Sequence, residues 1–467
     1  MKQQRAVASF AFVWSGSRMT VMKNYAKHFS GKYIIMLGLG LLGRGLNDAK
    51  FFAECGAKLL ITDMKSRKEL MTSLAALKPY KNIRYVLGEH RFSDFEKGDM
   101  VLKAARVPLD SPYIALARKH SIPIEMDASL FARLAEGVTV VGITGTRGKT
   151  TTTHLVFNML KAAGKRVYLG GNIRDMATLP LIKKIRKGDI VVLELDSWQL
   201  QGFGDAKLSP HVAVFTNFLD DHLDYYHGNR NLYFRDKAHI FAHQNKGDIC
   251  IVSKQVIPWI KKKYRTHAKR CISVNETFVP RRWKLRVPGE HFRANVALAS
   301  AAAKKLGIAV SVIRIVAESF ASVGGRLERL RDVRGIAVYN DTCATTPDAT
   351  CAALLALGKK KNIVLILGGH DKKLDMAKLL GLLPRYCASV VLLAGSGTDR
   401  IRVPMYKHKK LAVAEAATLK EAVATAFVCA KKGDIILFSP AFASFGMFKN
   451  EYDRGDQFIA VLKSMRP

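Results

Sequence analysis

The chain has 467 residues, which is enough for about three domains of ordinary size. With 49% hydrophobic and 24% charged residues, its composition excludes a disordered chain, a collagen and a coiled-coil rod. No run of about 18 apolar residues exists, so we expect no membrane-spanning helix. Lysine and arginine number 75 against 38 acidic residues, a net charge of +37, which indicates either an anionic partner (nucleic acid, a phosphorylated substrate, acidic lipid) or a generally basic proteome.

The seven cysteines lie at positions 55, 250, 271, 343, 351, 387 and 429, and no two of them form C-x-x-C. This spacing argues against a disulfide framework or a zinc ribbon and fits a reducing cytoplasm, where we expect the protein to reside. At the N-terminus, Lys2–Arg5 followed by Ala6–Trp14 is a weak match to a signal peptide. We expect residues 1–21 to be a dispensable extension, or the result of an early start with Met19 or Met22 as the true start, rather than an export signal.

Short apolar runs alternate with helical patterns along the chain, which is typical of α/β folds with parallel sheets covered on both faces. The first series of predicted strands is Tyr33–Gly38, Lys58–Thr62, Ile83–Leu87 and Met100–Leu102, followed by a helix near Tyr113–Lys119. The second series is Val138–Ile143, Val167–Leu169, Ile190–Leu195, Val212–Thr216 and Ile249–Val252. The third series follows Gly324-Gly325 and is Ile336–Tyr339, Ile363–Leu367, Val390–Leu393 and Ile435–Phe438. We predict three α/β units with boundaries near residues 122 and 321.

A first glycine-rich loop follows the first predicted strand. Its residues Gly38, Gly40 and Gly43 have the spacing G-x-G-x-x-G, and Asp63 lies 20 residues beyond at the end of the next strand. This is the fingerprint of a dinucleotide-binding fold, in which the loop approaches a pyrophosphate and the acidic residue approaches a ribose. Taken alone it suggests a dinucleotide enzyme; the alternative is a glycine turn that binds nothing.

A second glycine-rich loop, Gly142–Thr151, also lies between a strand and a helix. The strict phosphate-loop spacing fails by one residue, but Gly148-Lys149-Thr150 retains the parts that matter. Backbone N–H groups can surround phosphates, Lys149 can reach the β and γ oxygens, and the Thr150 hydroxyl can bind Mg²⁺. Two such loops in separate domains favour an ATP-driven enzyme with a second, diphosphate-bearing substrate over a dehydrogenase.

Acidic residues follow two later strands, at the end of the sheet where ligands bind in open α/β folds. Glu194 is a candidate Mg²⁺ ligand, although a solvated acid at a strand end is the alternative. The segment Thr216–Asp224 holds three carboxylates and His222, which predicts a metal or phosphate site with His222 as a ligand. Judged from its chemistry alone, Lys237 is a surface lysine.

Together these segments resemble the Mur ligases. The matching segments are Gly142–Thr151, Gly170–Ile173, Leu193–Leu200, Asn217–Asp224, Lys237, Gly325–Glu328, Asn340–Thr342, Gly368–Lys372 and Ser439–Ser444. They occur in order, and matching segments run from about Tyr33 to Phe458. Within the family, the pattern is most similar to the branch that joins D-glutamate to UDP-N-acetylmuramoyl-L-alanine.

The resemblance implies a fold of three domains. Residues 1–122 would hold the N-terminal extension and a Rossmann-like domain that binds UDP, with Gly38, Gly40, Gly43 and Asp63 on the nucleotide. Residues 123–321 would form a central P-loop ATPase-like domain with a parallel sheet that binds ATP and Mg²⁺. Residues 322–467 would form a C-terminal Rossmann-like domain that binds the incoming amino acid.

The resemblance also implies roles for individual residues. Lys149, Lys237 and His222 would be catalytic, and the metal ligands for two Mg²⁺ ions would be Thr150, Glu194, His222 and a carbamylated Lys237. The residues that contact ATP would be Gly145, Thr146, Arg147, Gly148, Lys149, Thr150, Thr151, Asn295, Arg326 and Asp341. Asn172 would lie near the nucleotide substrate, while Lys372 and Ser444 would hold the acceptor's carboxylates.

By the same resemblance, the activity is an ATP-dependent ligation in peptidoglycan precursor synthesis. The substrate carboxylate attacks the γ-phosphate of ATP to give an acyl phosphate and ADP, and the amine of the amino acid then displaces phosphate. Because a carboxylate must approach an anionic triphosphate, Lys149 and Mg²⁺ would screen the repulsion. We expect a monomer whose partners are UDP-N-acetylmuramoyl-L-alanine and D-glutamate, with no obligate nucleic acid and no membrane span.

The chain departs from the family pattern at several positions. Cys343 stands where lysine is usual, Gly446 where aspartate is usual and Glu451 where an aromatic residue is typical, with Tyr452 next to it. The family's His-Asn-x-x-Asn reads His-Phe-Arg-Ala-Asn at residues 291–295, and Arg147 replaces a frequent asparagine. Positions 343, 446 and 451 fall where the acceptor is expected, so a different acceptor such as L-glutamate, and an inactive nucleotide-binding relative, stay open as alternatives. A nucleic-acid-binding P-loop ATPase is a further alternative suggested by the charge alone.

Overall fold

The computed structural model describes residues 25–41, 43–108, 110–174, 176–407 and 411–465. The expected N-terminal extension, residues 1–21, lies outside the described residues, as does Leu42 of the first glycine loop. The described chain forms two compact units: the residues up to Val138 together with Ile173–Asp189, and the residues Thr139–Asn172 together with Ile190 onward. The domain boundaries near 122 and 321 stay predictions. No helix among the described residues is long and apolar enough to cross a membrane.

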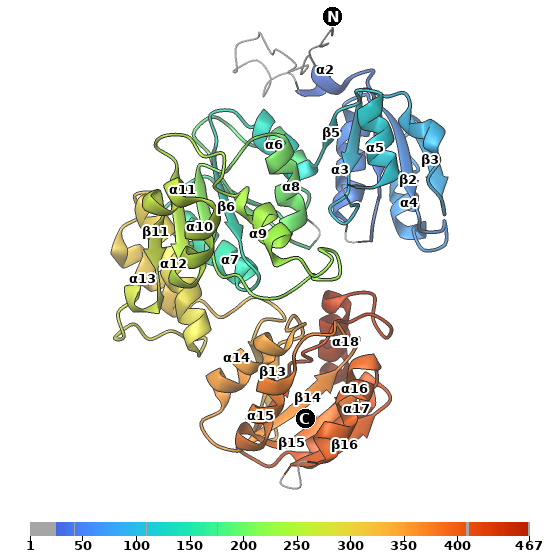
Figure 1. Ribbon diagram of the computed structural model, residues 1–467. Coiled ribbons are helices and arrows are strands. Elements are labelled where there is room, and N and C mark those ends of the chain that lie inside the picture. The colour runs from blue at the N-terminus through green and yellow to red at the C-terminus, as the bar shows by residue number, and fades with distance from the viewer. Residues whose placement is uncertain (1–24, 42, 109, 175, 408–410, 466–467) are drawn as a thin grey trace, which may run out of the picture. The chain divides into compact units, whose positions relative to one another are not determined.

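The first unit is built on a five-stranded parallel sheet, drawn in blue in Figure 1, with the strand order β3-β2-β1-β4-β5. Its strands are β1 (Tyr33–Leu37), β2 (Lys58–Asp63), β3 (Ile83–Leu87), β4 (Met100–Lys103) and β5 (Ile124–Glu125). Its helices are α2 (Tyr25–Phe29), α3 (Arg44–Glu54), α4 (Met71–Leu77), η1 (Phe92–Phe95), α5 (Pro112–Lys119), α6 (Asp127–Leu134) and η2 (Leu179–Lys183). The order of the strands reverses between β1 and β4, which is where open α/β sheets bind ligands.

The second unit contains two sheets. The first of them is parallel, with the order β11-β10-β9-β6-β8-β7. Its strands are β6 (Thr139–Thr144), β7 (Val167–Gly171), β8 (Ile190–Glu194), β9 (Val212–Phe215), β10 (Ile249–Ser253) and β11 (Ile272–Val274). Its helices are α7 (Lys149–Ala162), α8 (Ser197–Asp205), α9 (Arg230–Ala238), η3 (Lys254–Val256), α10 (Ile257–Lys263), α11 (Arg265–Arg270), η4 (Glu276–Phe278), α12 (Glu290–Lys305) and α13 (Val310–Ser319). Because β6 lies between β9 and β8, the ends of these three strands are neighbours.

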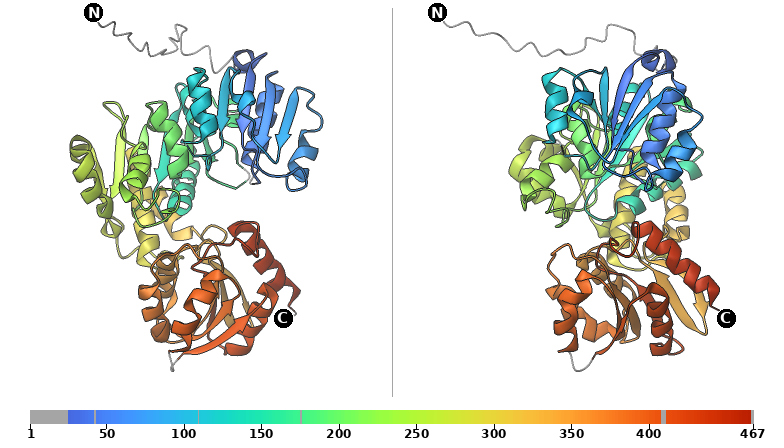
Figure 2. Two further views of the ribbon diagram at one scale, coloured as in Figure 1. Left: turned by 45° about the vertical axis from the view of Figure 1, so that its right-hand side comes forward. Right: turned by 90° about the vertical axis from the view of Figure 1, so that its right-hand side faces the viewer.

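The other sheet of this unit has the order β12-β13-β17-β14-β15-β16. Its strands are β12 (Glu328–Val333), β13 (Ile336–Asn340), β14 (Ile363–Gly368), β15 (Cys387–Leu393), β16 (Ala412–Ala416) and β17 (Ile435–Phe438). Its helices are α14 (Pro347–Leu357), α15 (Ala377–Tyr386), α16 (Ser396–Tyr406), α17 (Leu419–Cys429) and α18 (Glu451–Ser464), and Figure 2 shows them from two further sides.

Alternate residues of the central strand β14 belong to opposite layers of this domain. Ile363, Leu365 and Leu367 pack with residues of α14, α15 and α16, whereas Val364 and Ile366 pack with residues of α17 and α18. Successive side chains of a strand point to opposite faces, so an unbroken apolar run is what a strand buried on both faces requires. The first of these clusters also contains residues of α7 and α12. The two sheets of the second unit therefore share one continuous apolar core.

The predicted strands are confirmed with small shifts at their ends, and four were missed. The missed strands are β5, β11, β12 and β16, all at sheet edges. One of them departs from the parallel arrangement of the other strands, because β12 is antiparallel to β13. The two strands are joined by Arg334 and Gly335, both with positive φ (53° and 75°), as a tight two-residue hairpin turn requires. The sequence did not predict this hairpin, because the turn lacks the Asn-Gly pair that is typical of two-residue turns.

Candidate active site

The loop between β6 and α7 is fixed in place by residues that follow β9. The backbone N–H of Thr146 donates to the carbonyl of Asn217 (2.9 Å), and that of Arg147 donates to Asn217 Oδ1 (2.8 Å). Gly148 has φ 80°, and a Cβ atom there would lie 2.3 Å from Asn295 Oδ1. Only glycine fits such a position. The structure thus places Asn295, from α12, directly against the predicted phosphate loop.

Two lysines converge on one carbonyl oxygen of this loop. Lys149 Nζ donates to the carbonyls of Gly145 (3.2 Å) and Thr146 (3.1 Å), and Lys237 Nζ donates to the same Gly145 carbonyl (2.8 Å). Lys237 is 1% exposed, so the interpretation of a surface lysine is wrong. Burial and the neighbouring charge of Lys149 hold the pKa of Lys237 well below its usual value. Burial therefore disfavours the charged form of this side chain.

Glu194 ends the strand beside the loop, where it is paired in register with Ile143. Its side chain is buried, and its Oε2 atom has no hydrogen-bond partner. Burial raises the pKa of Glu194, while the charge of Lys149 and a hydrogen bond with Thr150 oppose that shift. A buried carboxylate oxygen without a partner, beside a threonine hydroxyl and a lysine, fits the hard oxygen ligands of Mg²⁺ bound to a phosphate. Asn172 is also here, since its backbone N–H donates to the Glu194 carbonyl (2.7 Å).

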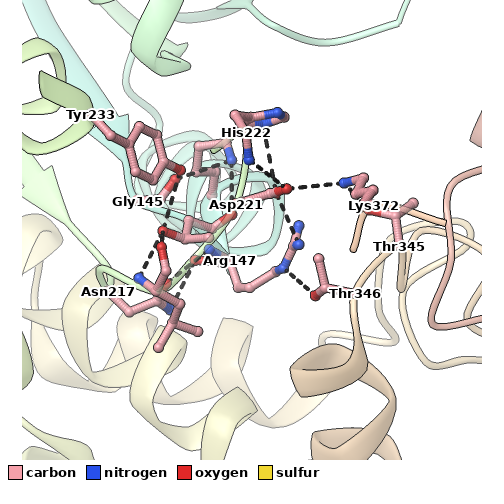
Figure 3. A network of polar contacts seen from close by, with 12 residues as sticks. Gly145, Arg147, Asn217, Asp221, His222, Tyr233, Thr345, Thr346 and Lys372 are labelled. Carbon is pink, nitrogen blue, oxygen red and sulfur yellow. Dashed lines mark hydrogen bonds and ion pairs between the residues drawn. The ribbon is translucent and has the colours of Figure 1, made fainter. Parts of the chain in front are cut away.

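The loop after β9 brings a second carboxylate and an imidazole to the site, as Figure 3 shows. Asp221 is buried and accepts hydrogen bonds from Arg147 Nη2 (3.0 Å) and Lys372 Nζ (3.0 Å). Burial alone would raise the pKa of Asp221, but these two cations hold it well below its usual value. The His222 ring packs against that of Trp198 at a tilt of 52° (4.5 Å between ring centroids), and burial lowers the pKa of its imidazole to about 3. The imidazole is neutral, as a metal ligand must be.

Residues just before β12 and just after β13 and β17 complete the cluster. The charge of Arg326 acts on Glu194, and its Nη1 atom lies 3.4 Å from Cys343 Sγ. Asp341 accepts from the Leu327 N–H (2.9 Å) and the Ser439 hydroxyl (2.8 Å), and burial raises its pKa to about 7. Ser444 is buried, its Oγ atom has no hydrogen-bond partner, and its neighbour Ala443 forms a backbone bridge to His370, two residues before Lys372.

The positions that depart from the Mur pattern have distinct surroundings. Burial raises the pKa of the Cys343 thiol to about 11, so this side chain is neutral. Gly446 has φ 95°, a conformation that favours glycine over aspartate. Tyr452 is hydrogen-bonded to Arg326. Glu451 uses its backbone carbonyl to accept from the Thr342 hydroxyl.

The first glycine loop lies in the other unit and has its own partner. The N–H groups of Leu39 and Gly40 donate to one oxygen of Asp63 (2.8 and 3.0 Å), and that of Lys65 donates to the other (2.8 Å). Gly38, Gly40 and Gly43 all have positive φ (94°, 66° and 78°). Asp63 therefore holds the shape of the loop directly, a contact that the fingerprint spacing did not predict.

Sequence reasoning missed Asp221, Asn217, Thr345 and Thr346 as individual site residues. Asp221 was visible only as one of three carboxylates after β9, and nothing in the sequence distinguished it from Asp220, whose pair with Arg230 is exposed. No group of three or more His, Cys, Asp or Glu side chains gathers as a metal site in the described parts of the chain.

Comparison with known families identifies the family of this chain. The model of the Mur ligase middle domain matches residues 143–303, and that of the Mur ligase, glutamate ligase domain matches residues 325–442. The chain belongs to the Mur ligase family. The two matched segments contain the phosphate loop, Glu194, His222 and Lys237 on one side and Arg326, Asp341 and Lys372 on the other.

Full-length relatives point to one branch of the family. A UDP-N-acetylmuramoylalanine--D-glutamate ligase of Roseiflexus sp. (strain RS-1) is 34% identical over 467 aligned positions, covering 93% of this chain and 99% of the relative. The ligase of the same name from Geobacillus kaustophilus (strain HTA426) is 32% identical and covers 92% of this chain and 98% of the relative.

Solved structures agree on the fold. The UDP-N-acetylmuramate-alanine ligase MurC of Thermotoga maritima has a TM-score of 0.61 at 18% identity, covering 93% of this chain and all of that one. The MurF ligase of Thermotoga maritima, solved in complex with ADP, has a TM-score of 0.55 at 18% identity and covers 86% of this chain and 94% of that one.

Proposed function

We propose that this protein is an ATP-dependent amide ligase that adds D-glutamate to UDP-N-acetylmuramoyl-L-alanine in peptidoglycan precursor synthesis. The observation that carries the proposal is the match, over nearly the whole chain, to ligases of that name. The convergence of Lys149, Lys237, Glu194 and Asp221 around the loop between β6 and α7 supports it, because such a cluster suits phosphoryl transfer.

The proposed reaction has two steps, phosphoryl transfer and amide formation. A carboxylate oxygen of the L-alanyl group attacks the γ-phosphorus of ATP, the bond to the β-phosphate oxygen breaks, and ADP leaves. The amine of D-glutamate then attacks the carbonyl carbon, the bond to phosphate breaks, and the amine loses a proton. Lys149 and the N–H groups of the loop hold the phosphates and neutralise the charge that develops on them.

Mg²⁺ would be held by Thr150 and Glu194, with His222 and Lys237 toward a second ion, and would supply Lewis-acid polarisation of the phosphoryl oxygens. Asn295, Arg326 and Asp341 contact ATP in this proposal, and Asn172 contacts the nucleotide sugar. Gly38, Gly40, Gly43 and Asp63 of the first unit bind its UDP group. Lys372 and Ser444 take the carboxylates of the amino acid, which suits a buried hydroxyl that has no partner within the protein.

Carbamylation of Lys237 is part of the proposal. The neutral amine attacks the carbon of CO₂ and releases one proton to solvent, which leaves an anionic carbamate. The side chain thereby changes from a hydrogen-bond donor to a ligand for a cation. The lowered pKa of Lys237 supports this, because it favours the unprotonated amine that reacts with CO₂. Lys237→Ala should lose activity, with no recovery in high bicarbonate; activity close to that of the unmodified protein would refute the role.

The test is ADP release by purified protein with UDP-N-acetylmuramoyl-L-alanine, Mg²⁺-ATP and single amino acids supplied in turn, with the amide product identified by mass. Release that requires both the sugar nucleotide and D-glutamate is the expected result. Release with another amino acid, such as L-glutamate, would mean that Cys343, Gly446 and Glu451 have changed the acceptor site. ATP binding without turnover on any acceptor would favour an inactive relative.

A further inference from the structure

The side chain of Arg147 leaves the phosphate loop and reaches the other sheet of the same unit. Its Nη2 atom donates to Asp221 Oδ2 (3.0 Å), and its Nε atom donates to Thr346 Oγ1 (3.1 Å), as Figure 3 shows. Thr346 immediately precedes α14 and so belongs to the domain that carries Lys372. One guanidinium therefore contacts both the nucleotide-binding and the amino-acid-binding parts of the site.

The base of this side chain is rigid. The Arg147 N–H donates to Asn217 Oδ1, and its carbonyl accepts from the Thr216 hydroxyl and from Asn217 Nδ2 (3.1 Å). Both partners directly follow β9, whose pairing with β6 fixes their place. Because the backbone of residue 147 cannot shift freely, the guanidinium presents its donors in a fixed direction. The planar guanidinium of arginine is better suited to this than the freely rotating ammonium group of a lysine.

Asp221 connects this arginine to Lys372. Its Oδ1 atom accepts from Lys372 Nζ (3.0 Å), and the same ammonium lies 3.5 Å from Thr345 Oγ1. The Asp221 side chain is 3% exposed, while those of Arg147 and Lys372 are 25% and 24% exposed. The buried carboxylate thus lies between two cations that are each partly exposed. Because the carboxylate itself is buried, solvent screens its attraction to them only weakly.

The charges of these three groups decide what an incoming anion meets. Asp221 and Lys372 by themselves form a neutral pair, whereas Arg147, Asp221 and Lys372 together carry one net positive charge. A carboxylate of an acceptor amino acid is attracted to the group of three, which has a net positive charge, and not to the neutral pair. The contact to Thr346 also fixes the segment that holds Thr345 beside Lys372.

We propose that Arg147 is a positioning residue for the acceptor amino acid: through Asp221 and Thr346 it orients Lys372 and supplies the net positive charge that the acceptor's carboxylate needs. Arg147 thus acts mainly in binding the acceptor and only secondarily in binding the phosphates of ATP. The inference rests on the proposed function for the identity of the acceptor, but its geometry does not depend on that identity.

The test compares Arg147→Gln with the unmodified protein in steady-state turnover, with KM measured separately for ATP and for D-glutamate. We expect the KM for D-glutamate to rise by roughly tenfold or more, because one partner of a largely buried charge pair is lost, and the KM for ATP to change by less than about threefold. A rise in the KM for ATP with an unchanged KM for D-glutamate would overturn the proposal and assign Arg147 to the phosphates.

Two further variants make the result specific. Thr346→Val removes the hydroxyl that accepts from Nε, so it should raise the KM for D-glutamate in the unmodified background and have little further effect in the Arg147→Gln background; additive effects would contradict the coupling. Arg230→Gln removes a guanidinium from an exposed pair with Asp220 in the same loop and is the matched control, with both KM values unchanged.

A second readout does not need turnover and separates this inference from the proposed function. Hydrogen–deuterium exchange of the protein alone should be faster in Arg147→Gln than in the unmodified protein for residues 342–350 and 369–373, and unchanged in the first unit. If the unmodified protein fails to use D-glutamate but this difference appears, the proposed function fails and the positioning role stands. If the exchange of both segments is unaltered, the positioning role is wrong whatever the acceptor is.

Discussion

Asp341 shows how the environment of one carboxyl group couples folding to pH. Its pKa is raised by burial from the ordinary value of 3.8 to about 7. Between those two values the folded chain binds more protons than the unfolded chain, so the free energy of unfolding decreases as the pH rises through this window. The contribution is fully present below about pH 4 and is lost above about pH 7.

Asp341→Asn should remove this dependence. The amide keeps an oxygen for the Leu327 N–H, and Ser439 can turn its proton toward Thr350 Oγ1, 2.9 Å away. We expect the variant to gain stability relative to the unmodified protein as the pH rises, by at most about 1.4 kcal/mol per pH unit between pH 4 and 7. Urea unfolding of both proteins at pH 5 and pH 8 measures the difference; parallel pH profiles would contradict it.

The role of Glu194 as a Mg²⁺ ligand can be tested through the dependence of turnover on Mg²⁺. Glu194→Gln keeps the size of the side chain and removes its charge, so Mg²⁺-dependent turnover should fall by roughly a hundredfold or more. Nucleotide binding in the presence of a chelator should be little changed, because Lys149 and the loop remain. Glu415→Gln, an exposed glutamate paired with Arg402, is the control. Full activity in Glu194→Gln would exclude the residue as a metal ligand.

Lys237 illustrates why the burial of a residue cannot be inferred from its side-chain chemistry alone. In the sequence it stands in a helix of mixed polarity and carries no sign of burial, yet the structure places it under the phosphate loop, 4.8 Å from the centre of the Tyr233 ring. The burial comes from how α9 packs beside the sheet, which depends on contacts far away in the chain. The family pattern located the residue, and only tertiary structure supplied the lowered pKa.

At the scale of elements, sheet register brings together two cysteines that are 21 residues apart. Ile251 of β10 is paired with Ile272 of β11, so the preceding residues Cys250 and Cys271 are neighbours, with their sulfur atoms 2.7 Å apart. The shared hydrogen bond raises the pKa of Cys250 and lowers that of Cys271. All seven cysteines are free in this structure.

This pair should behave as a dithiol. Treated with a small aromatic disulfide, Cys271 should form a mixed disulfide that Cys250 then displaces, leaving a Cys250–Cys271 bond and releasing two equivalents of reagent thiol. Peptide mapping locates the bond, and in Cys250→Ser the reagent should remain attached to Cys271. Stable, independent labelling of both cysteines in the unmodified protein would rule the exchange out. The spacing of these cysteines in the sequence gave no hint of the pair.

The elements themselves were largely predictable from the sequence, and the exceptions share a cause. Strands such as β6, β8 and β14 are unbroken apolar runs because both of their faces are covered. The edge strands β12 and β16 contain charged residues and mix buried with exposed positions. At an edge, hydrogen bonds to a neighbour form the strand, and the side-chain pattern says little about them.

At the scale of the whole molecule, the two compact units should unfold as separate cooperative transitions. The unit with the phosphate loop has a continuous apolar core that joins its two sheets, so those two sheets should melt together. In differential scanning calorimetry, we expect two transitions, of which Mg²⁺-ADP raises the midpoint of only one, since a ligand stabilises the unit that binds it. A single transition that shifts as a whole would contradict this division.

The sequence by itself determined the class of fold, the two glycine loops and the family, because apolar periodicity and short motifs are local properties of the chain. It also gave most of the residues at the candidate site, since these follow predicted strands in a parallel sheet. Only the tertiary structure decided that Lys237 is buried with a lowered pKa, that Asp63 holds its own glycine loop, and that Asp221 lies between Arg147 and Lys372. Those facts depend on desolvation and on contacts between residues as far apart as positions 221 and 372, which no local pattern encodes.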